Sequence, residues 1–278
     1  MTTVIVPTFN SEASVAGTLQ SIREQSRQPE NILVIDGGSR DGTLKVVAPF
    51  LRPCDRIVSE PDDGPYDAMN KGIRLAQSKI VATLNSDDRW LPGTLELVEK
   101  TFMNWPEVGI VHGDIHYVMD QSNTLRIRPT IGFWRSLGLG LPAVHPATFI
   151  RKDVYLRHGL YNFERFPIAA DQEFVYRVLA CAVKDKYVPE VLTVMMAGGL
   201  STRVDGTAEI DTLLDVLQPG KRWLAKRIRR VLNHDNRFYN GMVSSGFPRA
   251  IFSRLLVRAQ FKRVAGGWLR RLKARNSS

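Results

Sequence analysis

The first hundred residues alternate between short apolar runs and amphipathic segments, and this alternation constrains the fold more than any other feature of the chain. Four runs rich in β-branched residues predict buried strands at residues 2–6, 31–37, 56–60 and 79–85. Segments with helical periodicity follow them, at residues 11–27, 43–51, 65–77 and 93–103. Strands with continuous apolar runs that alternate with helices of this length predict a parallel α/β sheet covered on both faces.

Beyond residue 105 the pattern changes to longer strands and a loop that is rich in glycine and proline. The elements expected here are strands at 108–119, 124–130 and 186–195, a strand directly after the loop, and a helix at 170–182. We therefore assign residues 1–205 to an α/β domain, with halves at 1–105 and 106–205, and residues 206–278 to a helical tail.

The positive charge of the chain is concentrated near its end. The whole sequence carries a formal charge of +10. From residue 218 onward there are 16 lysines and arginines and one acid, which gives a local charge of +15. The 217 residues before this segment therefore carry 10 − 15 = −5. The acidic charge of residues 1–217 and the basic charge of the extension at 218–278 therefore need separate explanations.

Cysteine content and hydropathy bear on the compartment. Cys54 and Cys181 are too few for a disulfide framework, so a reducing compartment is expected. The first residues lack the basic region and the long apolar core of a signal peptide, so none is expected. No apolar run approaches the roughly 18 residues that a membrane-spanning helix needs. We therefore expect a cytoplasmic protein.

Acidic turns follow three of the predicted strands. They contain Asp36, then Glu60 with Asp62 and Asp63, and then the adjacent pair Asp87 and Asp88. The carboxyl ends of parallel strands meet at one edge of a sheet, where open α/β folds bind ligands. Clustered carboxylates repel one another until a divalent cation fills the site, and Mg²⁺ or Mn²⁺ would bridge them to phosphate oxygens. The alternative is a solvated acidic turn that caps the next helix.

Four segments carry a resemblance to a known family: VIVPTFN, VIDGGSRDGT, SEPDDGPYDAMNKGI and LNSDDRW. In this order and at this spacing they resemble the family 2 glycosyltransferases with the GT-A fold, and most closely the bacterial enzymes of polysaccharide and lipopolysaccharide assembly. The resemblance covers residues 2–200. It implies a Rossmann-like catalytic domain, with a nucleotide-sugar half at 1–105 and an acceptor half at 106–205.

The resemblance also implies roles for individual residues. The acid after the second strand, Asp36, would contact the nucleotide base. In the aspartate pair, Asp87 would contact the ribose and Asp88 would bind the metal, Mn²⁺ or Mg²⁺. The remaining residues expected in the nucleotide-sugar pocket are Pro7, Asp62, Asp63, Asp67 and Asn70. For Asp67 and Asn70 the alternative role is packing on a helix face.

Glycosyl transfer with inversion requires a base that takes the proton of the acceptor hydroxyl. The resemblance puts this base in the segment ADQEF, where it corresponds to Asp171. The acid that commonly precedes it is replaced here by Ala170, and Glu173 is the alternative base. Asp171 could instead act only as a first-turn acid that stabilises the helix dipole.

Two further residues are candidates for contact with the donor or the acceptor. Family members often carry a histidine near the phosphates or the acceptor at the position of His145, which is otherwise a loop residue before a proline. The segment GGLSTR, at residues 198–203, has the glycine content of a loop that closes over a diphosphate, with Arg203 as a phosphate partner.

The basic extension contains two amphipathic segments, at residues 222–232 and 250–272. Each gathers apolar residues on one helical face, with lysines and arginines around it. Such helices bind anionic membrane surfaces, so residues 221–275 are expected to do so. Docking of the apolar face on the catalytic domain is the alternative. Nucleic acid is not expected as a partner, because the aromatic residues follow the apolar face and the body is acidic.

We therefore expect an inverting, metal-dependent glycosyltransferase, peripheral on the inner face of the cell membrane. It would move a sugar from a nucleotide-sugar, expected to be a UDP-sugar, to a hydroxyl of a lipid-linked or polysaccharide acceptor of the cell envelope. One alternative is a sugar-1-phosphate nucleotidyltransferase, which would need a basic loop after the first strand, whereas PTFNSEASVAG has no lysine or arginine. The other is a non-catalytic module that binds nucleotide-sugar or membrane.

Overall fold

The structure, a computed structural model, describes residues 1–119, 124–129 and 142–197, together with Glu209 and Thr212. These ranges contain every candidate site residue except Arg203. Arg203 and the basic segment at 221–275 lie outside the described residues, so the roles predicted for them stay predictions.

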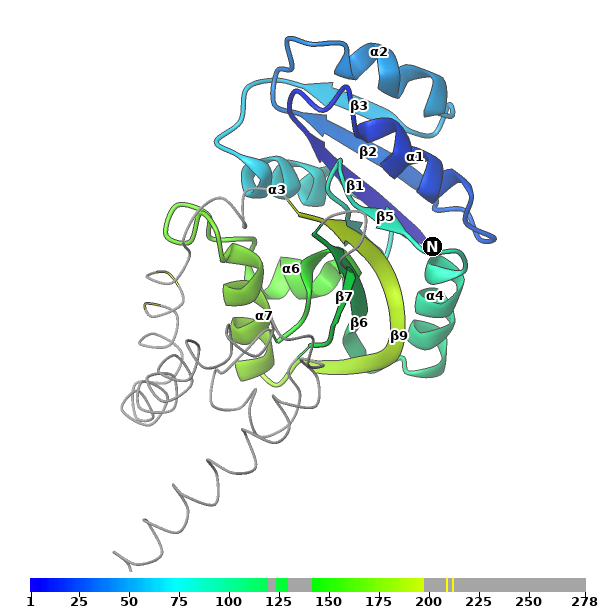
Figure 1. Cartoon of the computed structure of the whole chain (residues 1–278). Helices are drawn as coiled ribbons and strands as arrows, with labels where there is room; N and C mark the ends of the chain where they lie inside the picture. The colour runs from blue at the N-terminus through cyan, green and yellow to red at the C-terminus, as the bar shows by residue number, and fades with distance from the viewer. Residues whose placement is uncertain (120–123, 130–141, 198–208, 210–211, 213–278) are drawn as a thin grey trace, which may run out of the picture. The chain divides into compact units, whose positions relative to one another are not determined.

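Four parallel strands form the first half of the sheet, as the sequence predicts (Figure 1). They are β1 (Thr2–Thr8), β2 (Asn31–Asp36), β3 (Arg56–Ser59) and β4 (Ile80–Thr83). The helices that follow these strands are α1 (Val15–Arg23), α2 (Thr43–Val47) with the 3-10 helix η1 (Ala48–Phe50), α3 (Pro65–Leu75) and α4 (Thr94–Asn104). Each element predicted in this half is confirmed, with ends that shift by at most four residues.

The second half of the sheet is mostly antiparallel. Its strands are β6 (Val108–Val118), β7 (Thr124–Ile127), β8 (Thr148–Arg151), β9 (Lys184–Met196) and the short β5 (Arg89–Trp90). β8 runs antiparallel to both β4 and β6, whereas β9 runs parallel to β6. The 3-10 helix η2 (His145–Ala147) precedes β8, and α6 (Lys152–His158) and α7 (Ala170–Ala180) follow it. The described residues thus form one mixed sheet of nine strands. Of the elements in this half, β5, η2 and α6 were not predicted.

Helices cover both faces of the sheet, and β1 contributes to both cores. Val4 and Val6 pack in the core beneath α1, α2 and α4, whereas Ile5 packs in the core beneath α3, α6 and α7. All three side chains are fully buried, which is why the strand reads as a continuous apolar run. Gly72 lets α3 approach closely, because a Cβ at this position would lie 2.5 Å from Cγ2 of Ile5.

The order of the parallel strands creates a crevice at one edge of the sheet. β2 and β3 lie on one side of β1, and β4 lies on its other side, so the order is β3-β2-β1-β4. The connections after β1 and β4 therefore leave the sheet in different directions, and open α/β sheets bind ligands at such a point. The two loops that border it contain residues 9–14 and 84–88.

Candidate active site

A cleft of about 980 Å³ opens at the carboxyl ends of β1 and β4. Its walls come from the loops after these two strands, the start of α3, η2, the start of α7 and the end of β9. Of the residues predicted for the site, six line the cleft: Pro7, Asp62, Asp87, Asp88, His145 and Asp171. The other four in the described part of the chain are not among its lining residues: Asp36, Asp63, Asp67 and Asn70.

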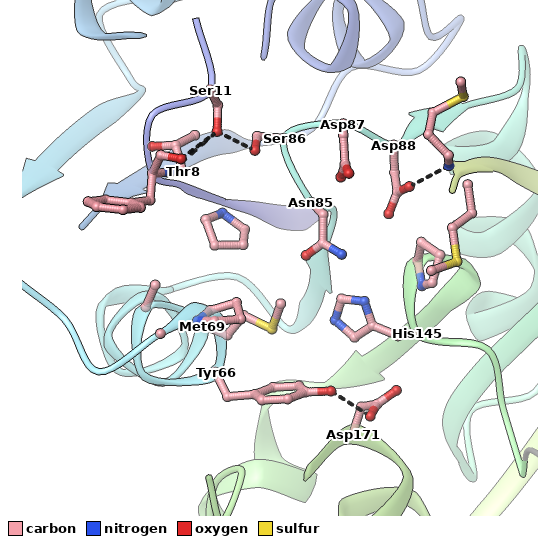
Figure 2. Close-up of a pocket in the computed structure, with 18 of the residues that line it drawn as sticks. Thr8, Ser11, Tyr66, Met69, Asn85, Ser86, Asp87, Asp88, His145 and Asp171 are labelled. Carbon is pink, nitrogen blue, oxygen red and sulfur yellow. Dashed lines mark hydrogen bonds between the residues drawn. The ribbon is translucent and has the colours of Figure 1, made fainter. Parts of the chain in front are cut away.

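Short polar side chains hold the loop after β4 in place. The Oγ atoms of Ser11 and Ser86 lie 2.8 Å apart and join this loop to the loop after β1. Thr18 of α1 donates its hydroxyl to the backbone oxygen of Asp88 at 2.8 Å. Figure 2 shows the result: the carboxylates of Asp87 and Asp88 both extend from this loop into the cleft.

Asp88 is a buried carboxylate with an unused oxygen. Its side chain is 1% exposed, and Oδ1 accepts a hydrogen bond of 3.2 Å from the N–H of Met196 at the end of β9. Oδ2 is buried and has no hydrogen-bond partner among the described residues. Burial, together with the neighbouring charge of Asp87, raises the pKa of Asp88 to about 8. In the free protein this carboxyl group therefore holds a proton at neutral pH.

Asp87 lies beside it, partly buried. Its pKa is also raised, because burial removes the carboxylate from water. The described residues contain no group of three or more histidine, cysteine or carboxylate side chains that could hold a metal by themselves. Two adjacent carboxylates, one with a free oxygen, do match the partial shell that Mg²⁺ or Mn²⁺ completes with phosphate oxygens and water. The pair therefore fits a divalent cation that arrives with a diphosphate.

Asp36 is fully buried and serves the turn that it begins. Oδ2 accepts the N–H groups of Gly38 and Ser39 at 3.1 and 3.0 Å and the hydroxyl of Ser59 at 2.6 Å. Oδ1 accepts the hydroxyl of Ser39 at 2.5 Å. Burial tends to raise the pKa of Asp36, but the hydrogen bonds from Ser39 and Ser59 outweigh it and lower the pKa. The carboxylate thus stabilises the turn after β2. Gly37, which follows Asp36 in this turn, lines the cleft.

Asp62 is the member of the acidic turn after β3 that lines the cleft. Its Oδ1 accepts the N–H of Gly64 at 2.9 Å, and burial raises its pKa. Asp63 is exposed, and its N–H donates to Oδ2 of Asp67 at 3.3 Å. Asp67 also pairs with Lys71 on the next turn of α3, at 3.4 Å. This turn is therefore held together by its own acids.

Asn70 is buried on α3 and binds the backbone of one residue. Its Nδ2 donates to the backbone oxygen of Tyr161 at 2.9 Å, and its Oδ1 accepts the N–H of Tyr161 at 3.0 Å. Both ends of the amide are thereby satisfied. This arrangement matches the packing role that was the alternative for Asn70, and it joins α3 to the segment that precedes α7.

Asp171 lies in the first turn of α7 and faces the cleft from the wall opposite Asp87 and Asp88 (Figure 2). Its Oδ1 accepts a hydrogen bond of 2.7 Å from the hydroxyl of Tyr66. Burial, and next the charge of Asp171, raises the pKa of Tyr66 well above its usual value, so the phenol stays a donor. Glu173, the alternative base, instead pairs with Arg177 at 2.7 Å and is not a lining residue.

His145 lies between the two acidic walls in Figure 2. Its Nε2 is 2.9 Å from the hydroxyl of Thr83, at the end of β4. The imidazole and the ring of Tyr66 form a T-shaped pair, with centroids 6.5 Å apart. Burial lowers the pKa of His145, so the ring is neutral at pH 7. A neutral imidazole in this position can exchange hydrogen bonds with a ligand without adding charge.

Among the lining residues that sequence reasoning did not select, Tyr66 and Phe9 bear most on function. Tyr66 lies in the first turn of α3, directly after the acidic turn, but its role depends on Asp171, which is 105 residues away. Phe9 follows β1, and this apolar side chain is 59% exposed at the cleft. A phenylalanine directly after a buried strand was a signal that could have been used, because ligand pockets often present an exposed aromatic face.

Within the described residues, no helix has the length and apolar content needed to cross a membrane.

Known proteins with sequence similarity point to one family. The profile of "Glycosyl transferase family 2" matches residues 3–160, more than half of the chain. A relative from Mycobacterium bovis (strain BCG / Pasteur 1173P2), named "PGL/p-HBAD biosynthesis glycosyltransferase", is 30% identical over 213 residues. That alignment covers 73% of this chain and 80% of the relative.

Solved structures give the same picture for the fold. S. aureus TarS 1–349 in complex with UDP has a TM-score of 0.59 and 19% identity, over 77% of this chain and 64% of that one. The chain spans 39% of the longer TarS structure. The mannosyltransferase PcManGT from Pyrobaculum calidifontis, in complex with GDP-Man and Mn²⁺, has a TM-score of 0.58 and 18% identity, over 94% of this chain and 80% of that one. The chain therefore belongs to glycosyl transferase family 2, and its mixed sheet is the GT-A fold that the four motifs indicate.

Proposed function

We propose that this protein is an inverting glycosyltransferase that transfers a sugar from a UDP-sugar to an acceptor hydroxyl. The observation that carries the proposal is the arrangement of three carboxylates in one cleft, with Asp87 and Asp88 on one wall and Asp171 on the other. The two walls divide the work of a displacement reaction. One wall would bind the leaving diphosphate, and the other would activate the attacking hydroxyl.

Asp171 is the proposed base. Its carboxylate would accept the proton of the acceptor hydroxyl while that oxygen forms a bond to the anomeric carbon. The bond from the anomeric carbon to the diphosphate oxygen breaks, and the electron pair leaves with UDP. One displacement at this carbon inverts its configuration. Tyr66 would hold Oδ1 of Asp171 through its 2.7 Å hydrogen bond and leave Oδ2 for the acceptor.

A divalent cation, Mn²⁺ or Mg²⁺, would be held by Asp88 with Asp87 beside it. Support comes from the buried Oδ2 of Asp88, which has no partner among the described residues, and from the Mn²⁺ in the PcManGT complex. When bound, such an ion supplies positive charge to the oxygens of the departing diphosphate. Asp88 must lose its proton for this, and His145 adds no competing charge nearby.

The nucleotide would lie across the loops after β1 and β4. We propose that the ring of Phe9 stacks on the base, that the turn organised by Asp36 borders the base, and that Asp62 and Asp87 contact the uridine. A direct contact between Asp36 and the base stays a prediction. UDP is proposed because TarS structures hold UDP and UDP-GlcNAc. The GDP-Man complex of PcManGT makes a guanine nucleotide the competitor to test.

The acceptor is proposed to be a lipid-linked or polysaccharide hydroxyl of the cell envelope, reached from the inner face of the membrane. Support comes from the two basic amphipathic segments within residues 221–275 and from the printed role of the mycobacterial relative in PGL/p-HBAD biosynthesis. Arg203 is retained as a proposed phosphate partner.

A screen of nucleotide-sugars tests the donor. Thermal unfolding is followed with UDP-, GDP- and dTDP-sugars in the presence of Mn²⁺, because a ligand that binds only the folded state raises the unfolding temperature. We expect UDP-sugars to give the largest shift, and the stabilising donor to release UDP slowly by hydrolysis. A larger shift with GDP-sugars would overturn the choice of nucleotide. If a nucleotide-sugar raises the unfolding temperature but no nucleotide is released, whichever acceptor is added, the result would favour a non-catalytic module.

A further inference from the structure

Glu209 contacts the peptide groups that lead into α7, although it lies about forty residues further along the chain. Its Oε2 accepts the N–H of Ile168 and the N–H of Ala169, each at 2.9 Å. Its Oε1 lies 3.2 Å from the same N–H of Ile168. A single carboxylate therefore holds two consecutive peptide groups just before the helix that carries Asp171.

Helix α7 has no side-chain cap of its own, and Glu209 binds the N–H of its N-cap residue and of the residue before it. The first N–H groups of a helix have no acceptor inside it, and a serine, threonine or aspartate at the N-cap normally supplies one. The N-cap here is Ala169, and the first helical residue is Ala170, neither of which has a side-chain acceptor. Glu209 brings a carboxylate to this end, where negative charge also interacts favourably with the helix dipole.

The same peptide is held from its other side by Tyr66. The Tyr66 hydroxyl lies 3.1 Å from the backbone oxygen of Ile168 and 2.7 Å from Oδ1 of Asp171. Ile168 is thus bound through its N–H to Glu209 and through its oxygen to Tyr66. A continuous set of hydrogen bonds runs from Glu209 through Ile168 and Tyr66 to the carboxylate of Asp171.

We propose that Glu209 is a positioning residue for Asp171. A residue that follows β9 in the chain would thus complete the acceptor side of the active site. This inference rests on the proposed function of Asp171 as the base. A displacement of the base by about 1 Å can lower the rate about a hundredfold. The donor residues lie on the opposite wall and have no contact with Glu209 among the hydrogen bonds of the described residues. Loss of Glu209 should therefore affect the reaction and spare donor binding.

The test compares three variants of the full chain. Glu209→Ala removes both acceptors, Glu209→Gln keeps one uncharged oxygen, and Glu164→Ala removes an exposed glutamate from the loop before α7. The measurements are kcat and donor KM for sugar transfer or donor hydrolysis, together with the Kd of UDP. We expect Glu209→Ala to lower kcat about tenfold or more, with donor KM and the Kd of UDP unchanged. Glu209→Gln should give a kcat clearly below that of the wild type but above that of Glu209→Ala, because an uncharged oxygen accepts weaker hydrogen bonds than a carboxylate. Glu164→Ala should match the wild type.

Each other outcome has a defined meaning. Wild-type kcat in Glu209→Ala overturns the inference, and so does an equal loss in kcat and in UDP affinity, which indicates general destabilisation. If Glu209→Ala fails to fold, Glu209→Gln decides, because unchanged kcat and KM in that variant together with a cooperative unfolding transition would also overturn it. Asp171→Asn, measured in parallel, separates the two levels. Full activity of Asp171→Asn removes the proposed function itself, whereas a large loss there with none in Glu209→Ala removes only the role of Glu209.

Discussion

The N–H of Met196 donates a hydrogen bond of 3.2 Å to Oδ1 of Asp88, although 108 residues separate the two along the chain. The end of β9 is thereby joined to the loop after β4 at the most buried carboxylate of the cleft. The contact uses one oxygen of Asp88 and leaves Oδ2 without a partner among the described residues. Oxygen Oδ2 is the atom that we propose to face the cation.

The raised pKa of Asp88 predicts a pH-dependent affinity for metal. Below the pKa of about 8 the carboxyl group is protonated, so a cation must displace one proton in order to bind. The Kd for Mn²⁺ in the presence of UDP should therefore fall about fivefold from pH 7 to pH 8, a range above the second phosphate pKa of about 6. Titration of free Mn²⁺, followed by electron paramagnetic resonance, measures this dependence.

Two variants serve as the comparison for that titration. Asp88→Asn should lose both the affinity and its slope with pH, whereas Asp153→Asn, an exposed carboxylate on α6, should behave as the wild type. An affinity for Mn²⁺ that does not change between pH 7 and pH 8 would contradict a protonated Asp88 as the ligand.

Tyr66→Phe tests the hydrogen bond that holds the proposed base. The substitution deletes one hydroxyl and keeps the ring against His145 and Tyr161. We expect kcat to fall about ten- to a hundredfold with little change in donor KM, because a hydrogen bond to a charged group contributes about 1.5–3 kcal/mol. Steady-state kinetics with varied donor concentration separates the two parameters.

Tyr155→Phe is the matched control. It also removes a tyrosine hydroxyl, one that is 2.9 Å from the hydroxyl of Tyr161 and buried away from the cleft. It should lower the unfolding temperature and leave kcat unchanged. Equal losses of kcat in both tyrosine variants would indicate that the hydroxyl of Tyr66 acts only on stability.

Phe9→Ala tests nucleotide stacking. Stacking of a base on an aromatic ring contributes about 1–3 kcal/mol, so we expect the Kd of UDP to rise about ten- to a hundredfold. Isothermal titration calorimetry gives the value directly. Met103→Ala, which truncates a side chain that is 68% exposed at the end of α4, should leave the Kd unchanged. If Phe9→Ala binds UDP as the wild type does, the base lies elsewhere.

The basic extension is tested by flotation with liposomes that contain anionic lipid. We expect the full chain to float with these vesicles, to bind less at high salt and to remain in the dense fraction with neutral vesicles, because lysines and arginines near an anionic surface attract it electrostatically. A chain that ends at residue 217 lacks the local charge of +15 and should not float. Equal flotation of the short and full chains would rule out the extension as the membrane anchor.

The alternation of apolar runs and amphipathic segments was enough to predict β1 to β4 and the helices between them. It could not predict β5, because two residues, Arg89 and Trp90, carry no periodic signal and form a strand only through pairing with β9. It also missed α6, which begins at Lys152 directly after β8. No loop separates the strand pattern from the helical pattern there. Pairing between distant segments therefore sets the limits of what a local pattern can predict.

The candidate site was predictable in part for the same reason. Strand ends located Asp87, Asp88 and Asp62 at the cleft, because the end of a parallel strand determines which edge of the sheet a residue reaches. The pattern could not reveal that Asp36 turns its carboxylate to its own loop, where it accepts hydrogen bonds from Ser39 and Ser59. The hydrogen bonds that such an acid accepts within its own turn depend on neighbours that only the folded chain brings together.

The central claim is that Asp171 acts as the base opposite the diphosphate site, and the rate of sugar transfer by Asp171→Asn tests it most directly. Asparagine has nearly the same shape but cannot take up a proton, and a general base contributes about a hundred- to ten-thousandfold. We predict that kcat falls by at least about a hundredfold, while the Kd of UDP with Mn²⁺ stays that of the wild type. Transfer by Asp171→Asn at the wild-type rate would contradict the account.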